Sequence, residues 1–139
     1  MKHSEITEKT IGCFYRVYNA LGYGLPERMY VKALRREFRD VALKSVAESR
    51  QQVFYRGDNL GTLVMDLVVE GKVVVEAKAC RTLAPEHEAQ LLSYLAGTKF
   101  EVGLLLGFCQ QAKFKRLIYD NDRKSWLGSV ESDSSVKSV

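Results

Sequence analysis

The sequence predicts an α/β domain in which helices flank a central mixed sheet. Apolar residues recur at helical spacing in the first 39 residues and again at 85–97. Two runs rich in β-branched residues occupy 62–79, and a short, wholly apolar run occupies 102–108. The resulting order is helix, helix, three strands, helix, strand, strand, which is typical of helices packed on one sheet.

The first half of the chain contains two helices and an extended segment. Ser4 is suited to cap a helix that runs to about Ala20, before a glycine-containing break. Pro26 suits the first position of a second helix, which we expect to reach about Arg39. Residues 42–56 alternate weakly, with a bend expected near Glu48-Ser49 and a turn expected at Gly57-Asp58-Asn59.

The next segment, 62–79, predicts a hairpin around the spacer Glu70-Gly71-Lys72. A three-residue loop pairs Val69 with Val73, Leu67 with Val75 and Met65 with Ala77, which gives one apolar face. A two-residue loop would leave two mixed faces, which are harder to bury. We therefore expect the three-residue loop.

That register places Asp66, Glu76 and Lys78 together on the opposite face. Opposed residues have Cβ atoms about 4.5–5.5 Å apart, so the two carboxylates would repel without a proton or cation between them. Carboxylate oxygens suit Mg²⁺ or Mn²⁺. The pattern predicts a divalent-metal site beside the sheet and a nuclease-like function, in which the metal stabilises charge on a phosphate and activates water.

The second half predicts a helix, two strands and a tail. The helix begins near Pro85 and ends near Gly97, with His87, Gln90 and Tyr94 on one polar side. Residues 102–108 predict a buried strand and 114–119 a further strand, at an edge. We expect one domain over 1–122 and a largely disordered tail over 123–139, where serine and charged residues predominate.

Composition narrows the class of protein. The 139 residues are 46% hydrophobic and 27% charged, as in globular domains, and the net charge of +4 permits nucleic acid as a partner without requiring it. No apolar run reaches membrane-spanning length and the N-terminus lacks a signal-peptide core, so we expect a cytoplasmic protein with no membrane partner. The three cysteines, Cys13, Cys80 and Cys109, fit reduced thiols.

Two segments carry a resemblance to a known family. Residues 24–30 read GLPERMY, which matches the signature of the GxxExxY proteins, and 87–95 and 103–108 resemble their downstream blocks. The resemblance covers about residues 5–120. That family is placed in the PD-(D/E)xK nuclease-like superfamily, whose restriction-endonuclease-like core is α-β-β-β-α-β.

The resemblance implies a role for each site residue. Asp66 would be the first metal-binding carboxylate, and Glu76-Ala77-Lys78 would be the E-x-K, with Glu76 and the Ala77 carbonyl as metal ligands. Lys78 would orient or deprotonate the attacking water, or stabilise charge on the phosphate. Glu27 would be an auxiliary acidic ligand, and Gln90 would assist the site. The implied cofactor is Mg²⁺ or Mn²⁺.

Other interpretations stay open at this point. Asp66, Glu76 and Lys78 could form a structural ion-pair cluster, and Glu27 could only stabilise its helix. His87 is better explained as a surface residue of a helix start and Tyr30 as a packing residue, while a charged edge strand explains Lys113, Lys115 and Arg116.

The sequence is therefore consistent with two functions. The first is a metal-dependent nuclease acting on nucleic acid, DNA favoured over RNA, and a domain this small would favour a homodimer. The second is a non-catalytic adaptor that binds nucleic acid or protein and retains the nuclease fold.

Overall fold

The computed structural model describes residues 1–127 and contains a five-stranded sheet in the order β1-β2-β3-β4-β5. Strands β3 and β4 are parallel, and every other neighbouring pair is antiparallel. The predicted α/β class and mixed sheet are confirmed. The elements are α1 (Ser4–Leu21), α2 (Glu27–Asp40), β1 (Ser45–Tyr55), β2 (Asp58–Val69), β3 (Val73–Lys78), α3 (Pro85–Ala96), β4 (Val102–Phe108), β5 (Ala112–Ile118) and the 3-10 turn η1 (Asn121–Arg123).

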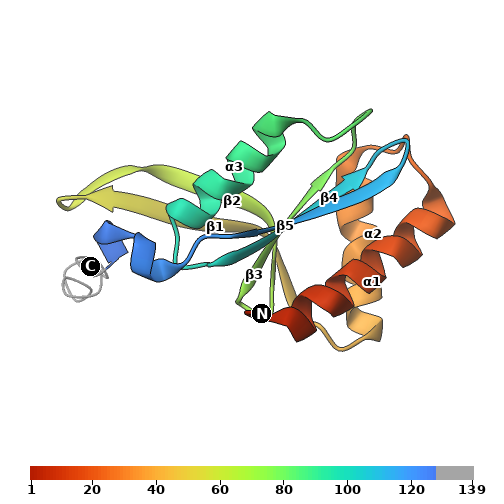
Figure 1. Cartoon of the computed structure of the whole chain (residues 1–139), viewed down its shortest axis with the longest axis horizontal. Coiled ribbons are helices and arrows are strands. Elements are labelled where there is room, and N and C mark those ends of the chain that lie inside the picture. The colour runs from red at the N-terminus through yellow and green to blue at the C-terminus, as the bar shows by residue number, and fades with distance from the viewer. Residues whose placement is uncertain (128–139) are drawn as a thin grey trace.

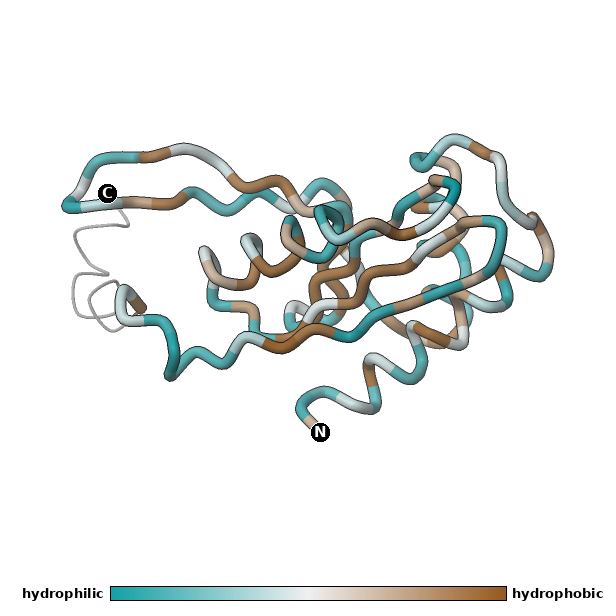
Figure 2. Tube along the Cα trace, turned by 45° about the horizontal axis from the view of Figure 1, so that its top comes forward, coloured by the Kyte–Doolittle hydropathy of each residue, from teal (hydrophilic) through white to brown (hydrophobic). Residues whose placement is uncertain are grey.

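Helices cover both faces of the sheet, as Figure 1 shows, with α1 and α2 on one side and α3 on the other. Each side has its own hydrophobic core. The core under α1 and α2 is the larger one and includes Phe14, Tyr30, Leu34, Leu67 and Phe108. The core under α3 contains Met65, Val68, Val74, Leu91, Leu95 and Leu105. Accordingly, the hydrophobic stretches of the chain collect towards the middle of the molecule in Figure 2.

Strand β4 lies between these two cores. All seven of its residues are buried, as expected for the apolar run 102–108. Its glycines let α3 and the loop before α3 approach closely, since a Cβ on Gly103 would meet Leu91 Cδ1 at 2.8 Å and a Cβ on Gly107 would meet Leu83 Cγ at 2.8 Å. The predicted edge strand is also present as β5, which pairs only with β4 among the described strands.

The two N-terminal helices begin one residue away from the expected positions. Helix α1 starts at Ser4 itself, and the capping position is His3, in a left-handed conformation. Pro26 is the residue before α2 rather than its first residue. Proline fits there because its fixed φ angle suits a helix start and its missing N–H leaves no donor unsatisfied.

The β1–β2 hairpin is long and has an irregular turn end. Its turn is Arg56-Gly57, with φ angles of 49° and 86°, so it lies one residue earlier than expected. Two successive positive φ angles are the mark of a type I′ turn, which matches the twist of paired strands. The expected bend in β1 is present at Glu48, whose φ is 51°.

The predicted three-residue loop between β2 and β3 is confirmed, because Val69 pairs with Val73, Val68 with Val74 and Leu67 with Val75. The prediction for Met65 is wrong. Met65 lies in the core under α3 and not on the Leu67 face. The backbone ladder between the strands ends at Leu67, so the alternation counted from the loop no longer fixes the face that Met65 presents.

The segment after β5 belongs partly to the domain. Lys124 is buried and its Nζ donates to the carbonyls of Thr98 and Phe100, both at 2.8 Å. Trp126 Nε1 donates to the Ala96 carbonyl at 2.9 Å. The expected tail therefore packs against the domain over 124–127, and its remainder, 128–139, lies outside the described residues. Within residues 1–127, no helix combines the length and apolarity needed to cross a membrane.

Candidate functional site

The site lies where the β2–β3 ladder opens. Past the Leu67–Val75 pair, two carboxylates replace backbone carbonyls as hydrogen-bond acceptors. The Asp66 N–H donates to Glu76 Oε2 at 2.7 Å, and the Ala77 N–H donates to Asp66 Oδ2 at 3.0 Å. Each acidic residue therefore accepts a bond from the strand that carries the other, which fixes both side chains in the gap.

Burial makes this pair electrostatically unusual. Glu76 is only 2% exposed, and its burial, followed by the nearby charge of Asp66, raises its pKa to about 8. Burial also raises the pKa of Asp66, an effect that the Ala77 N–H opposes and the charge of Glu27 reinforces. At neutral pH the pair is therefore suited to hold a shared proton or a cation.

Helix α3 supplies the polar wall of the site. Lys78 Nζ donates to Gln90 Oε1 at 3.0 Å, so the ammonium is held toward α3. Tyr94 lies one turn farther along and is half-buried. Its pKa is raised by burial and then by the charges of Glu76 and Asp66.

Glu27 reaches the same region from the first turn of α2. Its Oε1 accepts from the Ala79 N–H at 3.4 Å, immediately after the strand that carries Glu76 and Lys78. The preceding loop is fastened by Tyr30, whose hydroxyl donates to the Gly22 carbonyl at 2.8 Å and accepts from the Leu25 N–H at 3.2 Å. Tyr30 is fully buried and stacks on Phe108, as expected for a packing residue.

The donor chemistry of the pair fits a hard divalent cation. One oxygen of each carboxylate accepts a backbone bond, while Asp66 Oδ1 and Glu76 Oε1 accept none from residues 1–127. Mg²⁺ is commonly held by one or two carboxylates, with water and substrate phosphates completing its shell. Among the described residues, no group of three or more His, Cys, Asp or Glu side chains is arranged to hold a metal.

Three further residues, His87, Cys80 and Cys109, have structural explanations. His87 Nδ1 accepts from the Ala84 N–H at 3.0 Å and so caps the start of α3. Cys80 Sγ and Cys109 Sγ lie 3.5 Å apart as free thiols, and burial together with the Cys109 contact raises the pKa of Cys80 to about 11. The unreactive thiol form therefore predominates at Cys80.

Two of the three cations of β5 have partners among the described residues. Lys115 pairs with Glu88 at 3.3 Å, and Arg116 donates to the Lys2 carbonyl. Lys115 also lines a surface hollow with Lys113. This agrees with the explanation of β5 as a charged edge strand.

The family model described as "PD-(D/E)XK nuclease superfamily" matches residues 4–117. The chain belongs to this superfamily. The match spans both helices, the Asp66–Glu76 hairpin, α3 and β5, and the expected restriction-endonuclease-like fold is thereby confirmed.

Solved structures agree on the fold. The crystal structure of SSO0001 is similar, with a TM-score of 0.53 and 15% sequence identity over 78% of this chain and 57% of that one. At this identity the likeness shows the fold alone. The chain thus spans just over half the length of that protein. The search of curated proteins produced no match.

Sequence reasoning missed two features of the site. The hydroxyl of Tyr30 anchors the loop before Glu27, and only the Gly-x-x-Glu-x-x-Tyr spacing pointed to a link between these residues. The carboxylates also replace part of the backbone ladder, which no residue pattern signals.

Proposed function

We propose that this chain is a metal-dependent nuclease that hydrolyses phosphodiester bonds of nucleic acid. The observation that carries the proposal is the Asp66–Glu76 pair in the opened ladder, with Lys78 beside it. Superfamily membership supports a nuclease-like function. We further propose that the chain is a GxxExxY protein, located in the cytoplasm.

In this proposal each residue has a distinct task. Asp66 Oδ1, Glu76 Oε1 and the Ala77 carbonyl would hold Mg²⁺ or Mn²⁺, with Glu27 assisting from α2. The bound ion would stabilise negative charge on the phosphate and lower the pKa of a water molecule. Lys78 would orient that water or stabilise the phosphate, and Gln90 would fix the direction of the Lys78 ammonium through the bond between them.

The proposed substrate is DNA rather than RNA, and the proposed assembly is a homodimer. A single domain of this size offers little surface for a duplex. Size-exclusion chromatography with light scattering tests the assembly, for which a strict monomer is the contrary result.

The metal site is tested by calorimetric titration of Mn²⁺ into the wild type, Asp66→Asn and Glu76→Gln. Both substitutions keep side-chain shape and an oxygen that can accept the backbone bond. Glu48→Gln, an exposed carboxylate of β1, is the control. Binding by the wild type and the control that is lost in both site variants supports the proposal.

A second function is favoured by one observation. The described residues contain no three-ligand group, and both carboxylates already bond to backbone N–H groups. A non-catalytic adaptor that binds nucleic acid or protein would need no metal ligands beyond this arrangement. Absence of Mn²⁺ binding in the wild type, both with and without a nucleic acid present, would favour this adaptor.

A further inference from the structure

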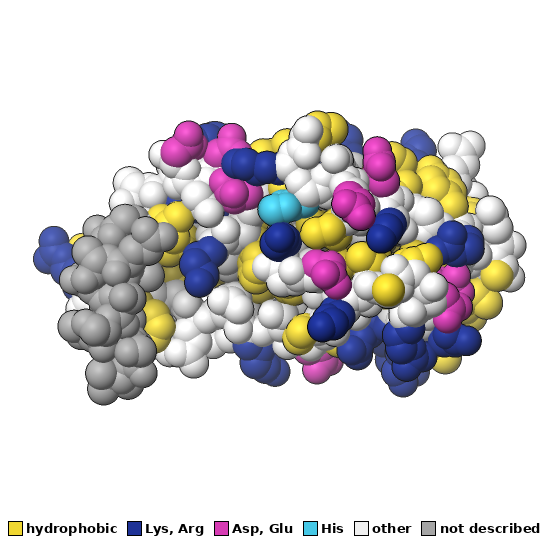
Figure 3. All heavy atoms as spheres, turned by 90° about the horizontal axis from the view of Figure 1, so that it is seen from below, with side chains coloured by type: hydrophobic (Ala, Val, Ile, Leu, Met, Phe, Trp, Pro, Cys, Tyr) yellow, Lys and Arg dark blue, Asp and Glu magenta, His cyan; other side chains and the backbone are white. Residues whose placement is uncertain are grey.

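Helix α2 carries a row of cations that starts beside the site. Arg28, Lys32, Arg35 and Arg39 follow one another at intervals of four, three and four residues, which places them along one side of the helix. All four are exposed. We call these four residues the α2 basic row. In Figure 3, Lys and Arg side chains gather at the right-hand end of the molecule, the end at which α1 and α2 lie in Figure 1.

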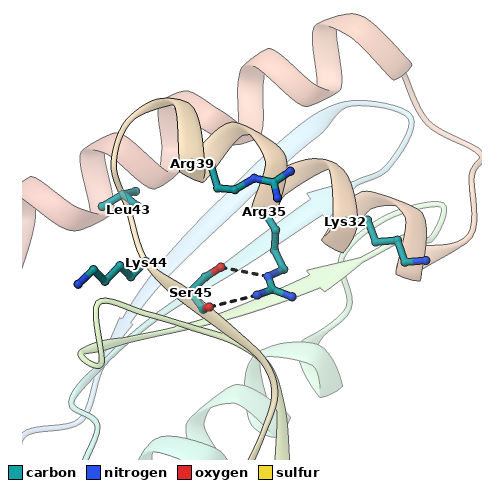
Figure 4. Close-up of a pocket in the computed structure, with 6 residues that line it drawn as sticks. All are labelled: Lys32, Arg35, Arg39, Leu43, Lys44 and Ser45. Carbon is teal, nitrogen blue, oxygen red and sulfur yellow. Dashed lines mark hydrogen bonds between the residues drawn. The ribbon is translucent and has the colours of Figure 1, made fainter.

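The row borders a hollow of about 510 Å³ between α2 and the start of β1. Lys32, Arg35 and Arg39 line this hollow from α2, and Lys44 lines it from the segment that leads into β1. In Figure 4 the Arg35 and Arg39 side chains lie near each other, while those of Lys32 and Lys44 extend to opposite sides. Arg35 is held in place because Nε and Nη2 donate to Ser45 Oγ and to the Ser45 carbonyl, both at 3.2 Å. Neither partner carries charge, so the guanidinium is oriented without being neutralised.

The cations of this hollow differ from two other cations of α1 and α2, which are ion-paired. Arg16 pairs with Glu37 at 2.8 Å and Arg36 with Asp40 at 2.6 Å. Within residues 1–127, by contrast, no acidic side chain forms an ion pair with any cation of the α2 basic row or with Lys44. Glu70 accepts a hydrogen bond from the Lys44 backbone N–H and not from its ammonium. Unpaired like charges around a concavity generate a positive potential that attracts anions.

The row also has a direction relative to the site. Arg28 follows Glu27, which bonds to the residue after Lys78, so the row leaves the site and runs along α2 to the hollow. At about 1.5 Å per residue, Arg28 and Arg39 lie about 16 Å apart along the helix axis. Phosphates of one strand recur about every 3.4 Å along B-DNA, so the row matches about five nucleotides and is too long for one phosphate group.

We propose that the α2 basic row and Lys44 bind the phosphate backbone of the nucleic acid whose scissile phosphate lies at Asp66 and Glu76. This inference rests on the proposed nuclease function and adds the surface along which the polymer lies. The contacts are to phosphates alone, so they position the strand without reading its sequence.

The test compares two charge-matched triple variants. Lys32→Gln/Arg35→Gln/Arg39→Gln removes three cations of the row. Arg16→Gln/Arg36→Gln/Lys115→Gln removes three cations that are ion-paired, so the net charge changes equally. Affinity for a fluorescein-labelled duplex is measured by anisotropy in EDTA, which prevents cleavage, between 50 and 200 mM salt. Urea midpoints verify that both variants fold.

We expect the row variant to bind more weakly and with a shallower salt dependence. Each lost phosphate contact reduces the slope of log K against log salt by about 0.9, so three contacts reduce it by about 2.7. Over a fourfold increase in salt, the wild type then loses about 40-fold more affinity than the row variant. The control variant should keep the slope of the wild type.

Equal slopes for the row and control variants would overturn the inference. The same titration is repeated with single strands and with vesicles of anionic phospholipid. The inference would also be overturned if the wild type bound neither duplex nor single strands, or if the row variant lost binding only to the vesicles. The Mn²⁺ titration distinguishes failure of this inference from failure of the nuclease proposal, because it measures metal binding at Asp66 and Glu76 and does not involve α2. Metal binding with equal slopes rejects the surface alone.

Discussion

Neutralising Glu76 should stabilise the metal-free protein at alkaline pH. Glu76 is 2% exposed, and burial with the charge of Asp66 raises its pKa from 4.5 to about 8. The folded protein therefore prefers the neutral form of this side chain. Glu76→Gln supplies a neutral side chain of the same shape at every pH, and its amide oxygen can still accept the Asp66 N–H.

The sign and the pH window follow from these two values. Between pH 4.5 and about 8 the folded state binds more protons than the unfolded state, so the stability of the wild type falls as pH rises through this window. Each pKa unit corresponds to about 1.4 kcal/mol, which limits the loss to about 5 kcal/mol. We expect Glu76→Gln to remove most of that loss and thus to gain stability relative to wild type as pH rises.

The assay is urea unfolding in EDTA at pH 5, 7 and 9. Glu48→Gln is the control, because this exposed carboxylate is neutralised without any relief of burial. At pH 9 the Glu76 variant should be more stable than wild type by several kcal/mol, and at pH 5 by much less. A difference that does not depend on pH, or a variant less stable at pH 9, would refute the burial argument.

Three further changes test other parts of the structure. Lys78→Met should reduce metal-dependent cleavage by about 10²–10⁴-fold in a labelled-substrate assay while Mn²⁺ binding persists, because Lys78 acts on water or phosphate; loss of both together would contradict this role. Gly103→Ala should lower the free energy of unfolding by about 1–3 kcal/mol in urea, since its Cβ would lie 2.8 Å from Leu91 Cδ1. Gly12→Ala, whose Cβ would meet only Arg16 at 3.9 Å, is the matched control and should not destabilise the protein. Tyr30→Phe should cost about 1–3 kcal/mol by the same assay, because the Gly22 carbonyl and the Leu25 N–H lose their partner; an unchanged urea midpoint would show that the hydroxyl does not fasten the loop.

The fold was predictable because several local signals agreed. Three signals each predicted one kind of element: helical spacing, the three-residue loop after Val69 and the apolar run at 102–108. Together they predicted the order of helices and strands. The register of the hairpin followed from the need to bury one whole face. That same reasoning failed at Met65, where side-chain acceptors interrupt the ladder.

That Asp66 and Glu76 lie together was predictable from the sequence, but the geometry of their contact was not. Charges in an apolar ribbon identify Asp66 and Glu76, since burial of such groups needs a reason. The Asp66 N–H donates to Glu76 and the Ala77 N–H donates to Asp66. These bonds depend on backbone positions that the residue types do not reveal. The packing of Lys124 and Trp126 was missed similarly, because a charged, serine-rich composition does not reveal which side chains find carbonyl partners.

The α2 basic row shows another property that the sequence alone does not reveal. The spacing of Arg28, Lys32, Arg35 and Arg39 is visible in the sequence. Whether a cation is neutralised depends on acids brought near by the fold, as Asp40 is for Arg36. Only the structure separates paired from unpaired cations.

The central claim is that Asp66 and Glu76 support hydrolysis of nucleic acid. Its most direct test is incubation of wild type, Asp66→Asn and Glu48→Gln with Mn²⁺ and end-labelled DNA and RNA, single- and double-stranded. We predict cleavage of at least one substrate by wild type and Glu48→Gln, and none by Asp66→Asn or in EDTA. Cleavage by Asp66→Asn at the wild-type rate, or no cleavage by any protein, would contradict the account.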